Sequence, residues 1–157
     1  MAVSNYERMI QLADEVFSSR TDPDQLNIDE NVMEHLQLIH PATISEYDDG
    51  NGPVCWILCI PTTSDLMTKF INKEISEREL YELTPLNTKY EAIYLCSALL
   101  LEEFRGKGIA QRLGAKAIEN IKIDHSIKAL FFWSFSKEGE KLAKKASVLM
   151  GLPLYKR

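Results

Sequence analysis

The sequence has few cysteines and no long hydrophobic segment. Its three cysteines, Cys55, Cys59 and Cys96, all lie within apolar runs, which is typical of reduced, buried thiols rather than of disulfides. The longest apolar runs are Val54–Ile60 and Ala92–Leu101, and both are shorter than the roughly 20 residues that cross a membrane. Acidic residues near the N-terminus interrupt the apolar core that a secretory signal needs. We therefore expect a cytoplasmic protein that does not span or bind a membrane.

The histidines lack the spacing of a metal site. His35, His40 and His125 are scattered, and neither a CxxC nor an HExxH pattern accompanies them. The lysines near the C-terminus come without a base-reading motif, and a solvated helix face accounts for them. We expect neither a metal nor a nucleic acid as ligand.

The composition is that of a single globular domain, and the charge is divided unevenly along it. The chain has 157 residues, of which 45% are hydrophobic and 26% charged, so we expect one domain over residues 1–157. The net charge is −5, but residues 1–104 carry −13 and residues 105–157 carry +8. This division has two interpretations. One is a basic site for an anion beside an acidic surface, and the other is chance placement on solvated helix faces.

Hydrophobic periodicity and turn signals predict an α/β fold. The first half should form two helices, around Tyr6–Phe17 and over Glu30–Ile39, a hairpin of Thr43–Tyr47 and Val54–Ile60, and helical residues from Ser64 to Leu83. A capping box is expected at Ser4 and Glu7, another at Ser76 and Glu79, and a break at residues 21–24. The second half should alternate a central strand over Tyr90–Leu101, a helix over Gly108–Ile121, a strand over Ile127–Phe135, a helix over Glu138–Met150 and a short strand over Leu152–Tyr155.

The segment between the central strand and the next helix has the residues of a phosphate-binding loop. Gly106 and Gly108 allow the backbone to wrap closely around a ligand at the start of a helix. The free N–H groups and the dipole of that helix favour an anion, and Arg105 and Lys107 add positive charge. The alternative is an ordinary strand-to-helix turn that uses glycine for tightness. A Walker A loop is absent, and Gln111 stands where a Rossmann fingerprint needs its third glycine.

The run Arg105-Gly106-Lys107-Gly108-Ile109-Ala110 resembles the central motif of the GNAT superfamily, the acyl-CoA-dependent N-acyltransferases. That motif is a strand, then Q/R-x-x-G-x-G/A, then a helix, and the elements around the run follow in the family's order. The resemblance covers Tyr90–Leu152 well and the earlier hairpin and N-terminal helix pair by order alone. It implies a GNAT-like mixed sheet with a shortened C-terminal end, because the family's closing hairpin would have only one strand here.

The resemblance also implies how acetyl-CoA, or another acyl-CoA, would bind as co-substrate. The pantetheine arm would pair with the backbone of Ala98-Leu99-Leu100, as a peptide adds to a sheet edge. A backbone N–H near Leu100 would polarise the thioester carbonyl. The pyrophosphate would lie on backbone N–H groups from Gly106 to Gln111, so the implied cofactor residues also include Arg105, Lys107, Gly108, Ile109 and Ala110.

The implied acid and base depart from the family pattern. Where many members carry a tyrosine as general acid this sequence has Ser147, with Tyr155 nearby as a substitute. Where some carry a glutamate as general base it has Ala92, with Glu91 one residue away, so Glu91 serves only if a bulge shifts the register. Glu140 replaces an asparagine near the cofactor. Surface or packing roles remain the alternative for Glu91, Ser147 and Tyr155.

The sequence thus predicts an N-acetyltransferase-type enzyme that moves a short acyl group from acyl-CoA to an amine by direct attack in a ternary complex. The acidic half favours a cationic small-molecule or protein amine as acceptor. Two alternatives remain: a catalytically weak acyl-CoA-binding module, and a partner-binding domain without a ligand. The single closing strand predicts a homodimer, unless the N-terminal helices complete the sheet.

Overall fold

The computed structural model describes residues 3–18, 26 and 29–157, and these form an α/β fold around one mixed sheet. The expected break at residues 21–24 lies outside the described residues. The strands are β1 (Ile44–Asp48), β2 (Pro53–Thr62), β3 (Ala92–Leu100), β4 (Ala129–Phe132) and β5 (Leu154–Lys156). The helices are α1 (Asn5–Ser18), α2 (Glu30–Ile39), α3 (Ser64–Ile71), α4 (Glu77–Leu83), α5 (Ile109–Asp124) and α6 (Lys137–Met150), with short 3-10 turns at η1 (Pro41–Thr43) and η2 (Glu102–Phe104).

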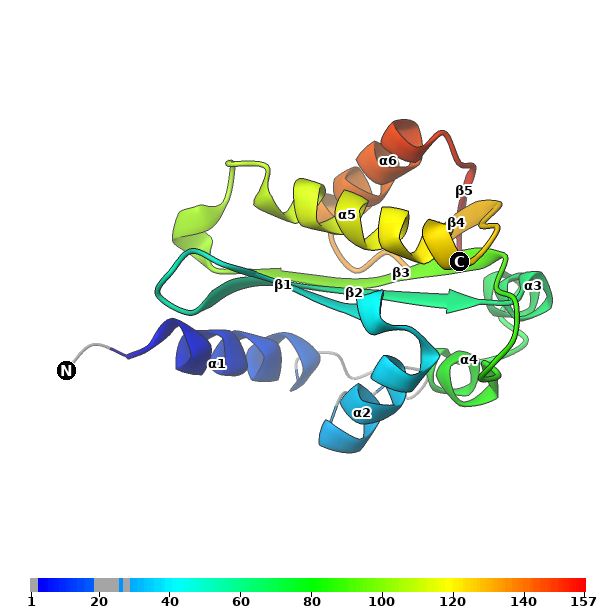
Figure 1. Cartoon of the computed structure of the whole chain (residues 1–157), viewed down its shortest axis with the longest axis horizontal. Helices are drawn as coiled ribbons and strands as arrows, with labels where there is room; N and C mark the ends of the chain where they lie inside the picture. The colour runs from blue at the N-terminus through cyan, green and yellow to red at the C-terminus, as the bar shows by residue number, and fades with distance from the viewer. Residues whose placement is uncertain (1–2, 19–25, 27–28) are drawn as a thin grey trace.

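The strands follow one another across the sheet in the order β1-β2-β3-β4-β5. The first three are antiparallel neighbours, whereas β3, β4 and β5 run parallel because α5 and α6 connect them as crossovers. Figure 1 shows α5 and α6 on one face of the sheet and α1 and α2 on the other. The basic C-terminal portion of the chain therefore covers one face, and the acidic N-terminal portion covers the opposite face.

Side-chain caps fix the starts of most helices where the sequence predicts them. Ser76 and Glu79 form the complete capping box of α4. Ser4 accepts the N–H of Glu7 at 3.2 Å, which is the first half of the box expected for α1. Gly151 ends α6 in the left-handed conformation with φ 64°.

A β-bulge interrupts the central strand. Leu58 on β2 pairs with Ser97, but the next residue, Cys59, pairs with Leu95, so Cys96 is an extra residue in β3. On its other side β3 pairs with β4 only from Ala92 to Tyr94. The parallel strands β3 and β4 therefore separate just before the bulge. Among the described strands, none pairs with residues 95–100 on that edge.

The core on the α3 side of the sheet is aromatic. Phe70 is fully buried, and its ring centroid lies 5.0 Å from that of Tyr94, 5.8 Å from Phe131 and 6.1 Å from Trp133. The guanidinium of Arg157 lies 4.4 Å from the Phe70 ring, a cation–π contact. Phe70 thus holds α3 against both of the strands that diverge.

Most elements occur where the sequence predicts them, but several begin or end at residues other than the predicted ones. The central strand begins at Ala92 rather than Tyr90, and β4 covers only Ala129–Phe132 of the expected Ile127–Phe135. Lys128, just before β4, donates its backbone N–H to the carbonyl of Glu91, and Leu130 within β4 donates its N–H to the carbonyl of Pro153. Helix α5 continues to Asp124 instead of ending at Ile121. Within the described residues, none of the helices is both long and apolar enough to cross a membrane.

Replacing Phe70 with alanine should destabilise the fold strongly, because it leaves a cavity between α3, β3 and β4. We expect the free energy of unfolding in urea to fall by about 3–5 kcal/mol. Phe135→Ala is the matched control, since Phe135 is 40% exposed, and it should cost about 1 kcal/mol or less. Equal losses in the two variants would contradict the central role of Phe70.

Candidate functional site

The divergence of β3 from β4 opens a cavity with a volume of about 530 Å³. Its walls come from β2, β3, the loop before α5, the residues after β4, and the facing sides of α5 and α6. The two helices contribute mainly small or aliphatic side chains, namely Ala110, Gly114, Ala115, Ile118, Gly139, Leu142, Ala143 and Ala146. Small residues on facing helices leave room for an extended ligand between them.

One wall of this cavity is an unpaired strand edge. In the antiparallel pair of β2 and β3, successive residues direct their backbone groups alternately toward and away from the partner. Leu101 donates its N–H to the carbonyl of Val54 at 3.0 Å, so Leu99, two residues earlier, also faces β2. The backbone N–H and C=O groups of Ala98 and Leu100 therefore point toward the gap left by β4. Of the three predicted strand residues, Ala98 and Leu100 line the cavity, whereas Leu99 packs on the α1 side.

The predicted loop lies at the end of this edge and has the conformation that its glycines allow. Gly106 and Gly108 adopt φ values of 79° and 74°, in the left-handed region that favours glycine. A Cβ on Gly106 would meet nothing within 4 Å, so the space above this backbone is open. Of the loop and first helical residues, Arg105, Gly106, Ala110 and Gln111 line the cavity. Ile109 is buried beneath the loop.

The first turn of α5 has free backbone donors that face the cavity. Its N-cap is Gly108, which has no side chain to accept them. The first intrahelical bond runs from the N–H of Arg112 to Gly108, which leaves the N–H groups of Ile109, Ala110 and Gln111 without a helical partner. Side chains cap the other five α-helices at Ser4, Asp29, Thr63, Ser76 and Ser136. Among the described helices, α5 is therefore the one whose first backbone N–H groups are free to bind an anion.

Three cations surround this helix start. Arg105 lines the cavity and is exposed. Arg112 donates a hydrogen bond to the carbonyl of Lys107 at 3.0 Å, and so braces the loop. The Lys107 ammonium lies 5.3 Å above the ring of Phe104 and does not line the cavity. A bidentate ion pair between Arg8 on α1 and Glu103 fixes the preceding turn at 2.6 and 2.7 Å.

The Cys59 thiol in the cavity wall stays protonated. Cys59 and Cys96 both line it, and burial raises the pKa of the Cys59 thiol to about 12. The nearby Cys55 thiol is affected in the same way, again with a pKa of about 12. A thiol with such a pKa supplies almost no thiolate near neutrality, so Cys59 is not an activated nucleophile.

The three predicted catalytic residues lie away from the cavity. Glu91 stands just before β3, where its carboxylate lies 3.7 Å from the Lys128 ammonium. The bulge that could have shifted its register is at Cys96, five residues further along. Ser147 donates its hydroxyl to the carbonyl of Leu152 at 2.6 Å and so stabilises the end of α6. Tyr155 lies on β5, outside the cavity lining.

Glu140 also turns away from the cavity. Its carboxylate accepts a hydrogen bond from the Lys156 ammonium at 2.9 Å, and this contact is the main cause of its lowered pKa. Lys156 lies on β5, and Glu140 is not among the residues that line the cavity. The Lys156 ammonium therefore compensates the Glu140 carboxylate outside the cavity wall.

Sequence reasoning missed four polar residues of the cavity lining, namely Ser97, Ser134, Ser136 and Glu138. The Oγ atom of Ser97 is buried and has no hydrogen-bond partner among the described residues. Ser97 follows the bulge residue Cys96 directly and lines the cavity. Nothing in the sequence marks this serine, because its position depends on where the bulge falls.

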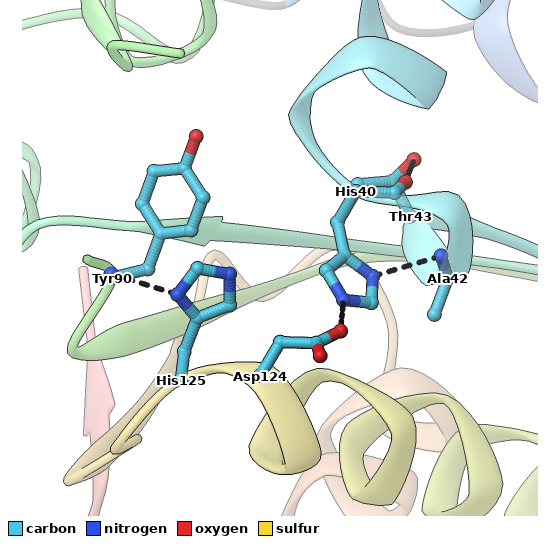
Figure 2. Close-up of polar contacts among 6 residues, drawn as sticks. All are labelled: His40, Ala42, Thr43, Tyr90, Asp124 and His125. Carbon is cyan, nitrogen blue, oxygen red and sulfur yellow. Dashed lines mark hydrogen bonds and ion pairs between the residues drawn. The ribbon is translucent and has the colours of Figure 1, made fainter. Parts of the chain in front are cut away.

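A second hollow, of about 460 Å³, lies at the other end of β3 beside a pair of histidines (Figure 2). His40 accepts the N–H of Ala42 at its Nδ1 (3.0 Å), and its Nε2 is 2.7 Å from the carboxylate of Asp124. The proton of a neutral His40 ring therefore lies on Nε2. His125 accepts the N–H of Tyr90 at its Nδ1, 3.3 Å away. These bonds connect the end of α5 to η1 and to the start of β3. Both ring nitrogens of His40 have hydrogen-bond partners.

The comparisons with known proteins leave the chain without an assigned family. Neither a family model nor a curated protein matches it. Across residues 3–18, 26 and 29–157, no group of three or more His, Cys, Asp or Glu side chains could hold a metal ion. The cavity between β3 and β4 is therefore the feature of the molecule that indicates a function.

His125 should make stability depend on pH. Burial lowers the pKa of His125, and His40 and Lys89 lower it further, against an opposing contribution from Asp124. Above about pH 6.5, the ordinary histidine pKa, the ring is neutral in both folded and unfolded chains and its contribution is complete. As the pH falls from there toward the lower folded-state pKa, the unfolded chain takes up the proton first, so stability is lost.

His125→Asn is the variant that tests this pH dependence. Asparagine keeps an acceptor for the Tyr90 N–H but does not titrate. Urea midpoints measured at pH 7.5 and 5.5 should fall further for the wild type than for the variant. The same fall in both proteins would show that His125 does not contribute.

Proposed function

We propose that this protein is a GNAT-type N-acyltransferase that binds acyl-CoA in the cavity between β3 and β4 and transfers the acyl group to an amine. One observation carries the proposal: a free strand edge and an uncapped helix start meet in the same cavity. The first suits a ligand with amide groups, and the second suits a phosphate. Acyl-CoA has both, with two amides in its pantetheine arm and a pyrophosphate at the end of it.

The positions of the helix start and of the free strand edge support one direction for a bound acyl-CoA. The pyrophosphate would accept hydrogen bonds from the N–H groups of Ile109, Ala110 and Gln111, with Arg105 beside it. From there the arm would run back along β3, pairing first with Leu100 and then with Ala98. The unpaired edge from Leu95 to Leu100 is about 20 Å long, which accommodates an extended arm.

Transfer by direct attack fits the chemistry of the cavity wall. With Cys59 held protonated, a covalent acyl-enzyme at this thiol is disfavoured, and the amine would attack the thioester carbonyl itself. A free backbone N–H of β3 would donate to the carbonyl oxygen as it gains negative charge. The thioester is at the far end of the arm from the phosphates, so the Ala98 N–H is better placed for this than the Leu100 N–H named from the sequence.

The acceptor would approach from the acidic side of the molecule. Helices α5 and α6 cover the face of the sheet that carries the phosphate loop, while α1 and α2 cover the other (Figure 1). Helices α1 and α2 belong to residues 1–104, which carry a net charge of −13. A cationic amine, on a small molecule or a protein, is therefore the proposed acceptor.

The second candidate function is acyl-CoA binding without turnover. Glu91, Ser147 and Tyr155 lie outside the cavity, and this observation favours it. Incubation with acetyl-CoA and a panel of cationic amines, with free CoA measured, separates the two. Amine-dependent CoA release that survives Glu91→Gln and Tyr155→Phe supports transfer with other groups in the cavity. Tight binding without release supports the binding module, and absence of binding overturns both.

Replacing Gly108 with valine should abolish acyl-CoA binding. A side chain here strains the backbone at φ 74° and pushes a Cβ to 3.0 Å from the Arg112 guanidinium that braces the loop. We expect affinity for acetyl-CoA in calorimetry to fall by at least about 10-fold, which corresponds to roughly 1.4 kcal/mol.

Gly50→Val is the matched control for that substitution. Gly50 also has a positive φ, 105°, but it lies in the hairpin between β1 and β2, where an added Cβ would meet nothing within 4 Å. It should lose stability without losing affinity. Unchanged affinity in the Gly108 variant would refute the assignment of the loop.

A further inference from the structure

Two acidic residues stand directly before the proposed phosphate loop. Glu102 and Glu103 begin the turn η2, and Arg105 follows Glu103 after a single residue. Both side chains are exposed, and charges in solution still act on one another over about 10 Å at 0.1 M salt. An uncompensated carboxylate beside the loop would therefore oppose the binding of an anion at the start of α5.

One of these carboxylates, that of Glu103, is paired with helix α1. The Arg8 guanidinium contacts it twice, with 2.6 Å from Nη1 to Oε1 and 2.7 Å from Nη2 to Oε2. The hydrogen bond from Arg8 is the main cause of the lowered pKa of Glu103, and the charge of Lys107 lowers this pKa further. Glu103 therefore interacts both with Arg8 and with a cation of the loop.

Apolar packing, more than this ion pair, holds α1 under the turn. Met9, the residue after Arg8, is fully buried in one cluster with Leu99 and Leu101, and Leu101 is the N-cap of η2. The ion pair itself is exposed, since the side chains of Arg8 and Glu103 keep 39% and 46% of their surface accessible. Exposed pairs contribute little to stability, so the charge of Arg8 is available for another role.

We propose that Arg8 neutralises Glu103 and so preserves the positive potential of the phosphate loop. This inference rests on the proposed function. Without Arg8, the Glu103 carboxylate would repel the pyrophosphate and would compete with it for Lys107. Arg8 is not among the residues that line the cavity, so it acts through Glu103 rather than by contact with the ligand. The acidic half of the chain thus supplies one cation that supports the anion site of the basic half.

Calorimetry with acetyl-CoA and with free CoA tests this role in Arg8→Met, Glu103→Gln and the double variant. At low salt, Arg8→Met should weaken the binding of both ligands by about 2- to 5-fold, the range for one exposed charge interaction. High salt should reduce this loss, because it screens the Glu103 charge. Glu103→Gln should bind at least as tightly as the wild type, since it removes the negative charge that Arg8 compensates. The double variant should bind like Glu103→Gln.

The effect of Glu103→Gln distinguishes charge compensation from structural support. If the ion pair acted by holding the turn in place, loss of either partner would weaken binding, and the double variant would not recover. A loss in Glu103→Gln equal to that in Arg8→Met therefore overturns the inference. Unchanged affinity in Arg8→Met overturns it as well.

Arg78→Met is the matched control. Arg78 also forms an exposed pair with a glutamate, Glu82, at 3.2 Å, but it lies on α4, at the opposite end of the molecule from the start of α5 (Figure 1). This variant changes the net charge by the same amount as Arg8→Met and should leave the affinity unchanged. Equal losses in the two variants would show an effect of net charge alone and would overturn the role of Arg8.

The wild-type measurement separates this inference from the function on which it rests. If the wild type binds acetyl-CoA and CoA, the variants decide the role of Arg8 alone. Failure of the wild type to bind either ligand overturns the proposed function, and the role of Arg8 with it.

Discussion

The early separation of β3 from β4 is the constraint on which the candidate site depends. The two strands pair over only three residues, from Ala92 to Tyr94, and the extra residue Cys96 then bends β3. An unpaired edge in the middle of a sheet is normally avoided, because its backbone groups need partners. Here the edge forms the wall of a cavity, so a ligand with amide groups would complete the sheet.

The cavity joins two features that are common when they occur separately. A helix N-terminus attracts anions in many proteins, and a strand edge accepts extended chains in many others. In this protein the short turn Leu101–Gly108 connects the two, so that the end of the free edge leads directly to the start of α5. One extended ligand with a phosphate at one end would satisfy both.

The cavity wall is better suited to binding than to proton transfer. Among the described residues, its titratable side chains are Arg105, Glu138, Cys59 and Cys96. Burial keeps the Cys59 thiol protonated, so this group offers no thiolate as a base. Transfer of the kind proposed would draw on backbone dipoles and on the high reactivity of the thioester, with proton movement left to the acceptor amine and solvent.

Local patterns along the chain are enough to predict an α/β fold with a glycine-rich, basic connection between its central strand and the following helix. Hydrophobic periodicity, the serines that cap α4 and α6, and the two glycines before α5 each act within a few residues of chain. Which side chains reach the cavity does not follow from these local patterns. Glu91, Ser147 and Tyr155 lie outside the cavity lining, because their positions depend on the packing of β3, α6 and β5 rather than on spacing along the chain.

The cavity itself follows from packing between distant segments. The bulge of β3 at Cys96, the departure of β4 after Tyr94 and the buried, unpartnered hydroxyl of Ser97 are features of the folded molecule alone. Strand register and divergence depend on side chains that approach from far along the chain. Beside these strands, the ring of Phe70 on α3 contacts both Phe131 on β4 and the guanidinium of Arg157. These residues are far apart in the sequence, so a local pattern cannot predict that they contact one another.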